Sequence, residues 1–251
     1  MSRSVAQHRT APAVVDGGRR PRRVEPLADV RGEETRAYAP GLTLAGKPGA
    51  AVRELPAPAP GDVGAPRTAR LDGLVDEIRA ALAALRAAPP EQAGEEVAAL
   101  LAPHLGCDDL LTPAQQEPQL HTYRQHLLHA EPEGSFSVVA LVWLPGQSTP
   151  IHDHVAWCAS GIHRGAETET VYRLVRDADE PYLVATATST SGVGAVSFLA
   201  PPGDIHDVRC AASGRTVSIH VYGADIARLG SSVRRTYTLP VLPAGGSGVP
   251  R

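Results

Sequence analysis

The sequence has few cysteines, and no two of them form a Cys-x-x-Cys pair. Cys107, Cys158 and Cys210 are the only three among 251 residues. A fold stapled by disulfides would need an even set of regularly spaced cysteines, and a zinc knuckle would need closely paired ones. The cysteine content therefore favours neither a disulfide framework nor a structural zinc site.

Long apolar runs are also absent. No segment approaches the ~20 consecutive apolar residues that a helix needs to cross a bilayer, and the N-terminus lacks the continuous apolar stretch of a secretory signal. We therefore expect a cytoplasmic protein with no membrane partner. Its oligomeric state is expected to be a monomer or a small homo-oligomer.

An excess of charge of one sign is missing as well, because the formal net charge is only −3. The one concentrated basic run lies at residues 19–23 and has no aromatic residues interleaved with its arginines. A solvated tail explains such a run better than a nucleic-acid contact does. We expect no nucleic-acid partner.

The two ends of the chain differ from its middle. Residues 1–68 are rich in Ala, Pro, Gly and Arg and show no sustained apolar period, which predicts a disordered tail. A short disordered tail is also expected at 243–251. Residues 69–118 have apolar positions at three- and four-residue spacing, so they predict two helices separated by Pro89-Pro90. These helices are too few to enclose a core, and we expect them to pack on a barrel formed by residues 119–242.

From residue 136 onward the pattern becomes that of β-strands. Short apolar or alternating segments follow one another, with Gly, Pro and Asp between them, and they lie at 136–143, 165–175, 182–188, 194–199 and 216–222. Many short strands in succession predict an all-β core built as an antiparallel barrel or sandwich.

Three histidines in this region have the spacing of a metal site. His152 and His154 are two residues apart, so on a strand both side chains point to the same side while Asp153 points away. A third ligand can come from His206, whose position is set by the turn at 201–203 that precedes it. Three protein ligands leave positions open for a substrate or oxygen, as in catalytic metal sites.

The spacing Gly146-x5-His152-x-His154, followed by Pro201-x-Gly203-x-x-His206, resembles the two motifs of the cupins. The resemblance implies a cupin-type double-stranded β-helix barrel. Where a typical cupin has a glutamate ligand, this chain has Cys158 and Ala159. Loss of that carboxylate leaves the three-histidine ligand set of the thiol dioxygenase branch, which comprises cysteine dioxygenase and 3-mercaptopropionate dioxygenase.

Ser218, His220 and Tyr222 match the Ser-x-His-x-Tyr signature of that branch. Alternation on one strand puts the three side chains on one face, where the serine can orient the imidazole and the imidazole can orient the phenol. An inward row of this kind could also be a core hydrogen-bond network, but the neighbouring metal motif favours a catalytic role.

The resemblance implies an iron(II)-dependent enzyme that oxidises a small thiol carboxylate, 3-mercaptopropionate or L-cysteine, with O2 to its sulfinic acid. Three neutral imidazoles leave the full 2+ charge on the ion, which favours a thiolate. Two alternatives remain open. The site could serve a three-histidine oxygenase with a non-thiol substrate, or the barrel could be a non-catalytic module in which a metal only orders a ligand pocket.

Substrate contacts are expected near the metal strand. If Tyr123 aligns with the tyrosine of the family's Tyr-x-Arg motif, the position of the carboxylate clamp is Gln125, as in 3-mercaptopropionate dioxygenases. The remaining candidates for binding the substrate are Trp157, Arg164, Arg234 and Arg235. Whether Cys158 forms a thioether with Tyr222, as a cysteine of the mammalian enzyme does with its tyrosine, is left open.

Overall fold

The computed structural model describes residues 66–176 and 180–242. The tail predicted at 1–68, except for residues 66–68, and the one predicted at 243–251 therefore lie outside the described residues, as does the basic run at 19–23. Within the described part of the chain, no helix has the length and apolar character needed to cross a membrane.

Two helices begin the described chain. Helix α1 (Ala69–Ala84) is capped by the Thr68 hydroxyl, which accepts a hydrogen bond of 3.1 Å from the backbone N–H of Leu71. Helix α2 (Pro90–Leu101) begins with a proline in its first turn, where the missing N–H costs nothing. Pro90 therefore starts the second helix as well as ending the connection from the first. Two short 3₁₀ turns follow, η1 (Ala102–His104) and η2 (Ala114–Gln116).

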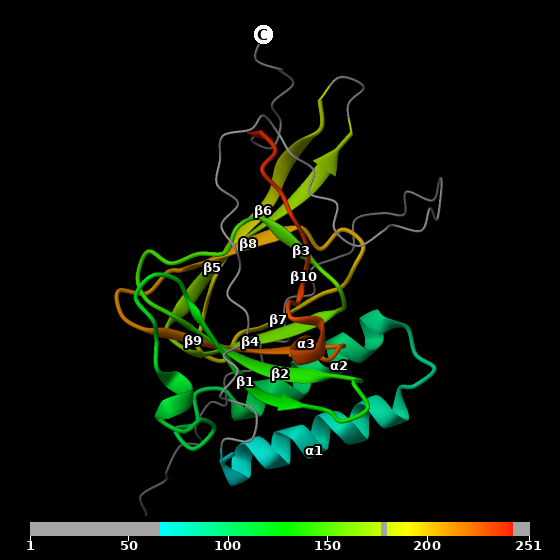
Figure 1. Ribbon diagram of the computed structural model, residues 1–251, viewed down its shortest axis with the longest axis vertical. Helices are drawn as coiled ribbons and strands as arrows, with labels where there is room; N and C mark the ends of the chain where they lie inside the picture. The colour runs from blue at the N-terminus through cyan, green and yellow to red at the C-terminus, as the bar shows by residue number, and fades with distance from the viewer. Residues whose placement is uncertain (1–65, 177–179, 243–251) are drawn as a thin grey trace, which may run out of the picture. The chain divides into compact units, whose positions relative to one another are not determined.

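Two sheets make up the rest (Figure 1). A five-stranded sheet has the order β1-β2-β9-β4-β7, and its strands are β1 (Arg124–Ala130), β2 (Ser137–Trp143), β9 (Thr216–Tyr222), β4 (Cys158–Arg164) and β7 (Val196–Leu199). A six-stranded sheet has the order β10-β3-β8-β5-β6-β11, and its strands are β10 (Val233–Thr236), β3 (His152–His154), β8 (His206–Cys210), β5 (Ala166–Val175), β6 (Tyr182–Gly192) and β11 (Val241–Leu242). Every pairing is antiparallel except that of β11 with β6. The short helix α3 (Ile226–Leu229) follows β9.

The central strands β2 and β9 of the five-stranded sheet are buried on both faces. All seven residues of β2 and all seven of β9 are buried. Alternate residues of these strands, such as Val138 and Ile219, pack with α1 and α2 in one apolar cluster. The residues between them, such as Leu141 and Tyr222, belong to a second cluster on the opposite face. Figure 1 shows the helices along one side of this sheet and the six-stranded sheet on its other side. The predicted all-β core with N-terminal helices is confirmed.

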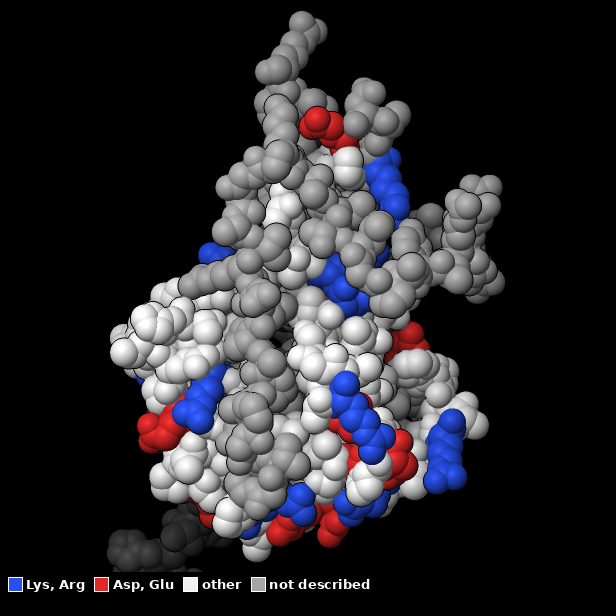
Figure 2. All heavy atoms as spheres, in the orientation of Figure 1, with Lys and Arg blue, Asp and Glu red and all other residues white. Residues whose placement is uncertain are grey.

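Several charged groups of the helical end form ion pairs. Arg79 binds both Asp76 and the buried Glu131, and Arg67 binds Asp72. On the face seen in Figure 2, Lys and Arg side chains lie beside Asp and Glu side chains at this end of the molecule. Such mixed surfaces contribute little to stability, because exposed ion pairs are screened by solvent.

Helix α2 approaches the sheet closely at one glycine. A Cβ atom built on Gly94 would lie 1.9 Å from the ring of Phe198 on β7, so the absence of a side chain allows the contact. Gly73 on α1 differs, because a Cβ atom there would meet nothing within 4 Å. The two helical glycines therefore have different physical reasons to be present.

We predict opposite effects from alanine at these two positions. Gly94→Ala should lower the free energy of unfolding by about 1–3 kcal/mol, because the methyl group must displace the Phe198 ring. Gly73→Ala should raise it by about 0.5–1 kcal/mol, because alanine loses less backbone entropy in a helix. Urea denaturation of both variants measures the difference, and equal effects at the two positions would contradict the close contact.

Candidate metal centre

Three histidines meet between the two sheets. His152 and His154 come from β3, and His206 comes from the neighbouring strand β8, where it is paired directly with His152. All three are buried, and the nitrogen atoms that they can offer to an ion lie within 4.8 Å of one another. The structure thus brings together the three residues that the sequence motifs singled out.

Each of the three rings is held by an oxygen atom at Nδ1. The partner of His152 is the backbone oxygen of Pro150 at 2.9 Å, that of His154 is Asp204 at 3.1 Å, and that of His206 is Glu169 at 2.6 Å. A carbonyl or carboxylate oxygen only accepts, so each Nδ1 donates its hydrogen and each Nε2 carries a lone pair. Such oxygen partners are what orient histidine ligands in metal sites.

The Nε2 atoms that remain fit a metal ion. Nε2 of His206 is fully buried and has no hydrogen-bond partner among the described residues. A buried lone pair without a partner is costly, and an ion would satisfy it. Iron(II) and zinc both bind three imidazole nitrogens, so this donor set does not by itself choose between them.

Burial keeps the rings of His152 and His206 neutral, which is the state that binds a metal. It holds the pKa of His152 well below its ordinary value, with a further lowering by the nearby His206 and His154. Burial and the neighbouring His154 also lower the pKa of His206 to about 3. Protons therefore do not compete for these two rings near neutral pH.

Asp153 lies on the other face of β3. Its Oδ2 accepts hydrogen bonds from Arg234 at 2.9 Å, from Arg235 at 3.0 Å and from the Tyr237 hydroxyl at 2.8 Å. Burial opposes ionisation of this carboxyl, but the three donors outweigh it and lower the pKa of Asp153. The expected substrate residues Arg234 and Arg235 are thus bound to the strand that carries the histidines, on its far side.

A row of polar side chains follows β9 toward the histidines. Ser218 Oγ lies 3.0 Å from Nε2 of His220 and accepts a hydrogen bond of 3.3 Å from the Trp143 indole. The other ring nitrogen of His220 faces Cys158 Sγ at 3.6 Å, and Cys158 is paired across β4 and β9 with Tyr222. The sequence predicted that His220 would orient the Tyr222 phenol, and in the structure their rings are stacked with centroids 6.0 Å apart.

The Tyr222 phenol stays protonated. Burial raises its pKa well above the ordinary value, and the neighbouring Cys158 raises it further. Its ring centroid lies 6.0 Å from that of His154, so the phenol borders the three histidines. Burial likewise raises the pKa of the Cys158 thiol, which therefore keeps its proton.

Two of the six expected substrate residues line the cavity beside the histidines. These two are Tyr123 and Gln125 from the start of the first sheet, and Tyr123 is stacked on Trp143 with ring centroids 4.3 Å apart. The remaining walls are formed by Leu141, Trp143, Thr149, Val208, His220, Tyr222, Ser232 and Val233. Arg164 is exposed at the end of β4, and the Trp157 indole packs on Gly223 beside the helix-facing core.

The sequence patterns did not reveal three carboxyl groups near this centre. Asp204 and Glu169 hold metal-site histidines, and Glu167 is buried on the same strand as Glu169. Burial raises the pKa of Glu167 to about 7 and that of Glu169 to about 6. The only available signal was the spacing of Glu167 and Glu169, which places them on one face of a strand, and that spacing does not say which face is inside.

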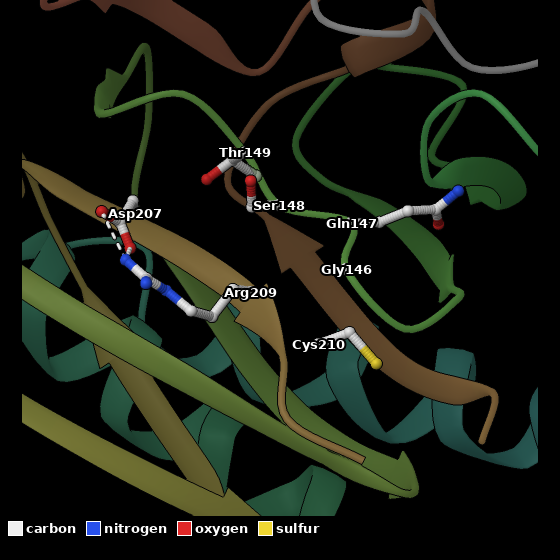
Figure 3. A pocket seen from close by; sticks show the side chains of 7 residues that line it. All are labelled: Gly146, Gln147, Ser148, Thr149, Asp207, Arg209 and Cys210. Carbon is white, nitrogen blue, oxygen red and sulfur yellow. Dashed lines mark hydrogen bonds and ion pairs between the residues drawn. The ribbon is translucent and has the colours of Figure 1, made fainter. Parts of the chain in front are cut away.

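A second pocket, of about 270 Å³, lies outside the histidine site. Figure 3 shows the ion pair of Asp207 and Arg209 on one side of it and the Cys210 thiol on another. Thr149 lines both this pocket and the cavity beside the histidines, so its side chain is part of the wall between them.

Removal of one ring should empty the site. We predict that His206→Ala lowers the metal bound per chain to less than a tenth, because two neutral imidazoles rarely retain an ion against chelators. Elemental analysis after dialysis gives the metal content. His104→Ala is the control, since this buried histidine is bonded to Glu77 away from the site. Full metal content in His206→Ala would show that the ligand set is wrong.

Several solved structures are similar to part of this chain. The chain is similar to a cupin superfamily protein of Desulfitobacterium hafniense DCB-2, with 15% identity, a TM-score of 0.34, and coverage of 48% of this chain and 95% of that one. It is similar to an RmlC-like cupin of Methanocaldococcus jannaschii with 14% identity, a TM-score of 0.32, and coverage of 46% and 92%. A double-stranded β-helix protein of Klebsiella pneumoniae subsp. pneumoniae MGH 78578 has 12% identity, a TM-score of 0.36, and coverage of 47% and 86%.

One family model matches part of the chain in sequence. Residues 112–229 match the family described as cysteine dioxygenase type I. The matched segment runs from η2 to α3 and so contains all three histidines and the row on β9. The part of this chain that carries the metal centre is therefore similar in sequence to the cysteine dioxygenase type I family.

Proposed function

We propose that this protein is an iron(II)-dependent thiol dioxygenase that converts a small thiol carboxylate and O2 to the corresponding sulfinic acid. The observation that supports this most directly is the cluster of His152, His154 and His206, each with Nε2 available and none replaced by a carboxylate. The family match points to the same reaction class. The overall change is R–SH + O2 → R–SO2H, so the substrate is oxidised by O2 and no external reductant is consumed.

Bound by the three Nε2 atoms, iron(II) would supply redox chemistry and a 2+ charge that favours a thiolate over a thiol. The chain supplies the cavity in which the reactants would meet. Leu141, Val208 and Val233 give the cavity apolar walls, which exclude water and strengthen the remaining polar contacts. Holding both reactants in one small space lowers the entropic part of the barrier.

Tyr222 is the residue of this row that reaches the reactants. Its pKa is raised by burial, so the phenol is a neutral hydrogen-bond donor at physiological pH. A positioned donor next to a group that gains negative charge lowers the barrier, typically by about 2–4 kcal/mol. Ser232 lines the same cavity as Tyr222, and Cys158 is paired with Tyr222 across β4 and β9.

The residues that line the cavity also indicate which substrate is preferred. Among the described residues that line it, none is Lys or Arg, and its polar groups near the first sheet are Gln125 and Tyr123. A substrate carboxylate would then meet neutral donors. L-cysteine also carries an ammonium group, which a 2+ ion repels, whereas 3-mercaptopropionate does not. The lining therefore favours 3-mercaptopropionate.

Oxygen uptake with a set of small thiols tests the reaction class. The chain loaded anaerobically with iron(II) should consume one O2 per sulfinate formed from 3-mercaptopropionate, while propionate should give none. His206→Ala serves as the inactive control. If none of 3-mercaptopropionate, L-cysteine and cysteamine supports sulfinate formation, the proposed function is wrong and a non-thiol substrate or a binding role is favoured instead.

Gln125→Arg tests the proposed clamp. A guanidinium would bind the carboxylate ionically and leave the amino group of L-cysteine free to lie beside the sulfur. We expect the ratio of kcat/KM for 3-mercaptopropionate over L-cysteine to fall at least tenfold, corresponding to roughly 1–3 kcal/mol. Gln125→Met, which has the same length and no charge, should slow both substrates alike. If Gln125→Arg leaves this ratio unchanged, Gln125 does not bind the substrate. The proposed reaction class would not be affected by that result.

A further inference from the structure

Asp153 is held by three side chains from one short segment of the chain. Its own side chain is 1% exposed. Its Oδ2 accepts hydrogen bonds from the two arginines and from a tyrosine hydroxyl, at distances between 2.5 and 3.0 Å. Its Oδ1 is also buried and has no hydrogen-bond partner among the described residues. We call Asp153, Arg234, Arg235 and Tyr237 the Asp153 cluster.

A β-bulge lets both arginines reach the same carboxylate oxygen. In the pairing of β10 with β3, Val233 lies opposite His154. The residue opposite Asp153 is Arg235. Arg234 is thus an extra residue between two positions that face consecutive residues of β3. A bulge of this kind bends the strand and redirects a side chain, which brings the second guanidinium to Asp153.

The opposite face of β10 forms a wall of the cavity beside the histidines. Ser232 and Val233 both line this cavity. Val233 is paired directly with His154, so the two side chains lie on the same face of the sheet. The backbone oxygen of Ser232 accepts a hydrogen bond of 2.9 Å from the N–H of Val155, which follows β3. The place of this wall is therefore set by how closely β10 lies on β3.

Backbone pairing holds β10 less firmly than the other walls. It is an edge strand, and its only neighbour in the sheet that the structure describes is β3, which has three residues (Figure 1). The strands β2, β9 and β8, which also line the cavity, each have a neighbour on both sides. Gln125 lies on the edge strand β1, but β1 pairs with β2 from Arg124 to Ala130. The Asp153 cluster therefore adds an attachment that β10 needs and the other walls do not.

The cavity is small enough for the place of one wall to matter. Its volume is about 20 Å³. One methylene group more or less in a substrate typically changes the rate constant kcat/KM by about 10- to 200-fold when the pocket is closely fitted. A wall that moves outward would lessen this discrimination against the longer molecule.

We propose that Asp153 is a positioning residue that limits the length of the thiol carboxylate, because the Asp153 cluster holds β10 and its cavity wall against β3. Asp153 itself does not line the cavity. Arg234 and Arg235 thus shape the cavity from behind its wall and do not bind the substrate. The effect on thiols rests on the proposed function, whereas the attachment of β10 does not.

Hydrogen exchange tests the attachment of β10 without turnover. The Val155 N–H donates to Ser232 and the Tyr237 N–H donates to Ile151, so both bonds join the segment around β10 to the segment around β3. In full-length protein loaded with zinc, Asp153→Asn should raise the exchange rates of these two amides at least tenfold. The arginines lose their anionic partner in this variant, and β10 separates from β3 more often. Equal rates in the wild type and Asp153→Asn overturn the proposal.

Two controls separate this effect from a general loss of stability. The Thr149 N–H donates to the oxygen of Val208 on β8, and its exchange rate in Asp153→Asn should be that of the wild type. Glu131→Gln is the matched variant, because Glu131 is also a buried carboxylate bound by an arginine, Arg79, but lies at the helical end of the molecule. It should leave the exchange of the β10 amides unchanged.

The length of the bound thiol is the second measurement. Calorimetry with the zinc-loaded protein compares 3-mercaptopropionate with 4-mercaptobutyrate, which is one methylene longer. The wild type should bind the shorter thiol more tightly, and Asp153→Asn should reduce this preference at least tenfold at an unchanged metal content per chain. The ratio of kcat/KM for the two thiols in the iron-loaded protein should change in the same direction. A wild type that binds both thiols equally well overturns the proposal.

A second variant leaves β3 untouched. In Arg235→Gln, Arg234 and Tyr237 still bind Asp153, so no charge is buried without a partner and the fold should be retained. We expect at least a threefold loss of the preference for the shorter thiol. A preference that Asp153→Asn changes and Arg235→Gln does not would assign the effect to β3 itself and overturn the proposal.

The two measurements also distinguish this proposal from the proposed function. Faster exchange of the β10 amides with an unchanged preference for the shorter thiol overturns the role in length selection. If no thiol is bound by the zinc-loaded protein or oxidised by the iron-loaded protein, the proposed function is wrong. The exchange rates then decide whether Asp153 holds β10.

Discussion

The metal centre depends on one constraint, which is that each buried imidazole must give one nitrogen to an oxygen of the protein before it can offer the other. The three oxygens come from a backbone carbonyl beside β3, from the turn before β8 and from β5. No single strand could supply them, because a residue two positions away on the same strand points its side chain in parallel and does not reach the ring edge. Closure of the six-stranded sheet around β3, β8 and β5 is therefore a requirement of the site.

Asp153, on the opposite face of β3, is also buried and also needs polar partners from another strand. A carboxylate between two ligands, if turned inward, would change the charge of the ion's surroundings. Its pairing with Arg234 and Arg235 of β10 keeps it on the far side and joins β10 to β3. The face of β3 that carries the histidines therefore has no charged side chain, because Asp153 is paired with the arginines of β10 on the other face.

Local sequence patterns were sufficient to predict the three metal-site histidines and the fold class. His152 and His154 are two residues apart, so their side chains were predicted on one side of a strand. The turn before His206 indicated where the third ring would lie. The fold class followed from the succession of short strands. Pairing between distant segments was not accessible, because no local pattern tells that β10 lies against β3 and draws its arginines to Asp153. The alternation of β5 was visible, but it did not show that Glu167 faces inward, since polar residues usually mark the outer face and here the interior itself is polar.

Because β9 is buried on both faces, substitutions in the core under the helices also affect the site. Val217, Ile219 and Val221 pack against the helices, and the three residues of the polar row alternate with them along the same seven positions. A backbone shift that accommodates a larger or smaller residue under the helices is passed to Ser218, His220 and Tyr222, since they share every peptide unit with that core. Hydrogen bonds of 3.0 Å do not absorb such shifts as apolar contacts do. Sequence drift in α1 and α2, remote from any reactant, is therefore restrained by the chemistry on the other side of the sheet.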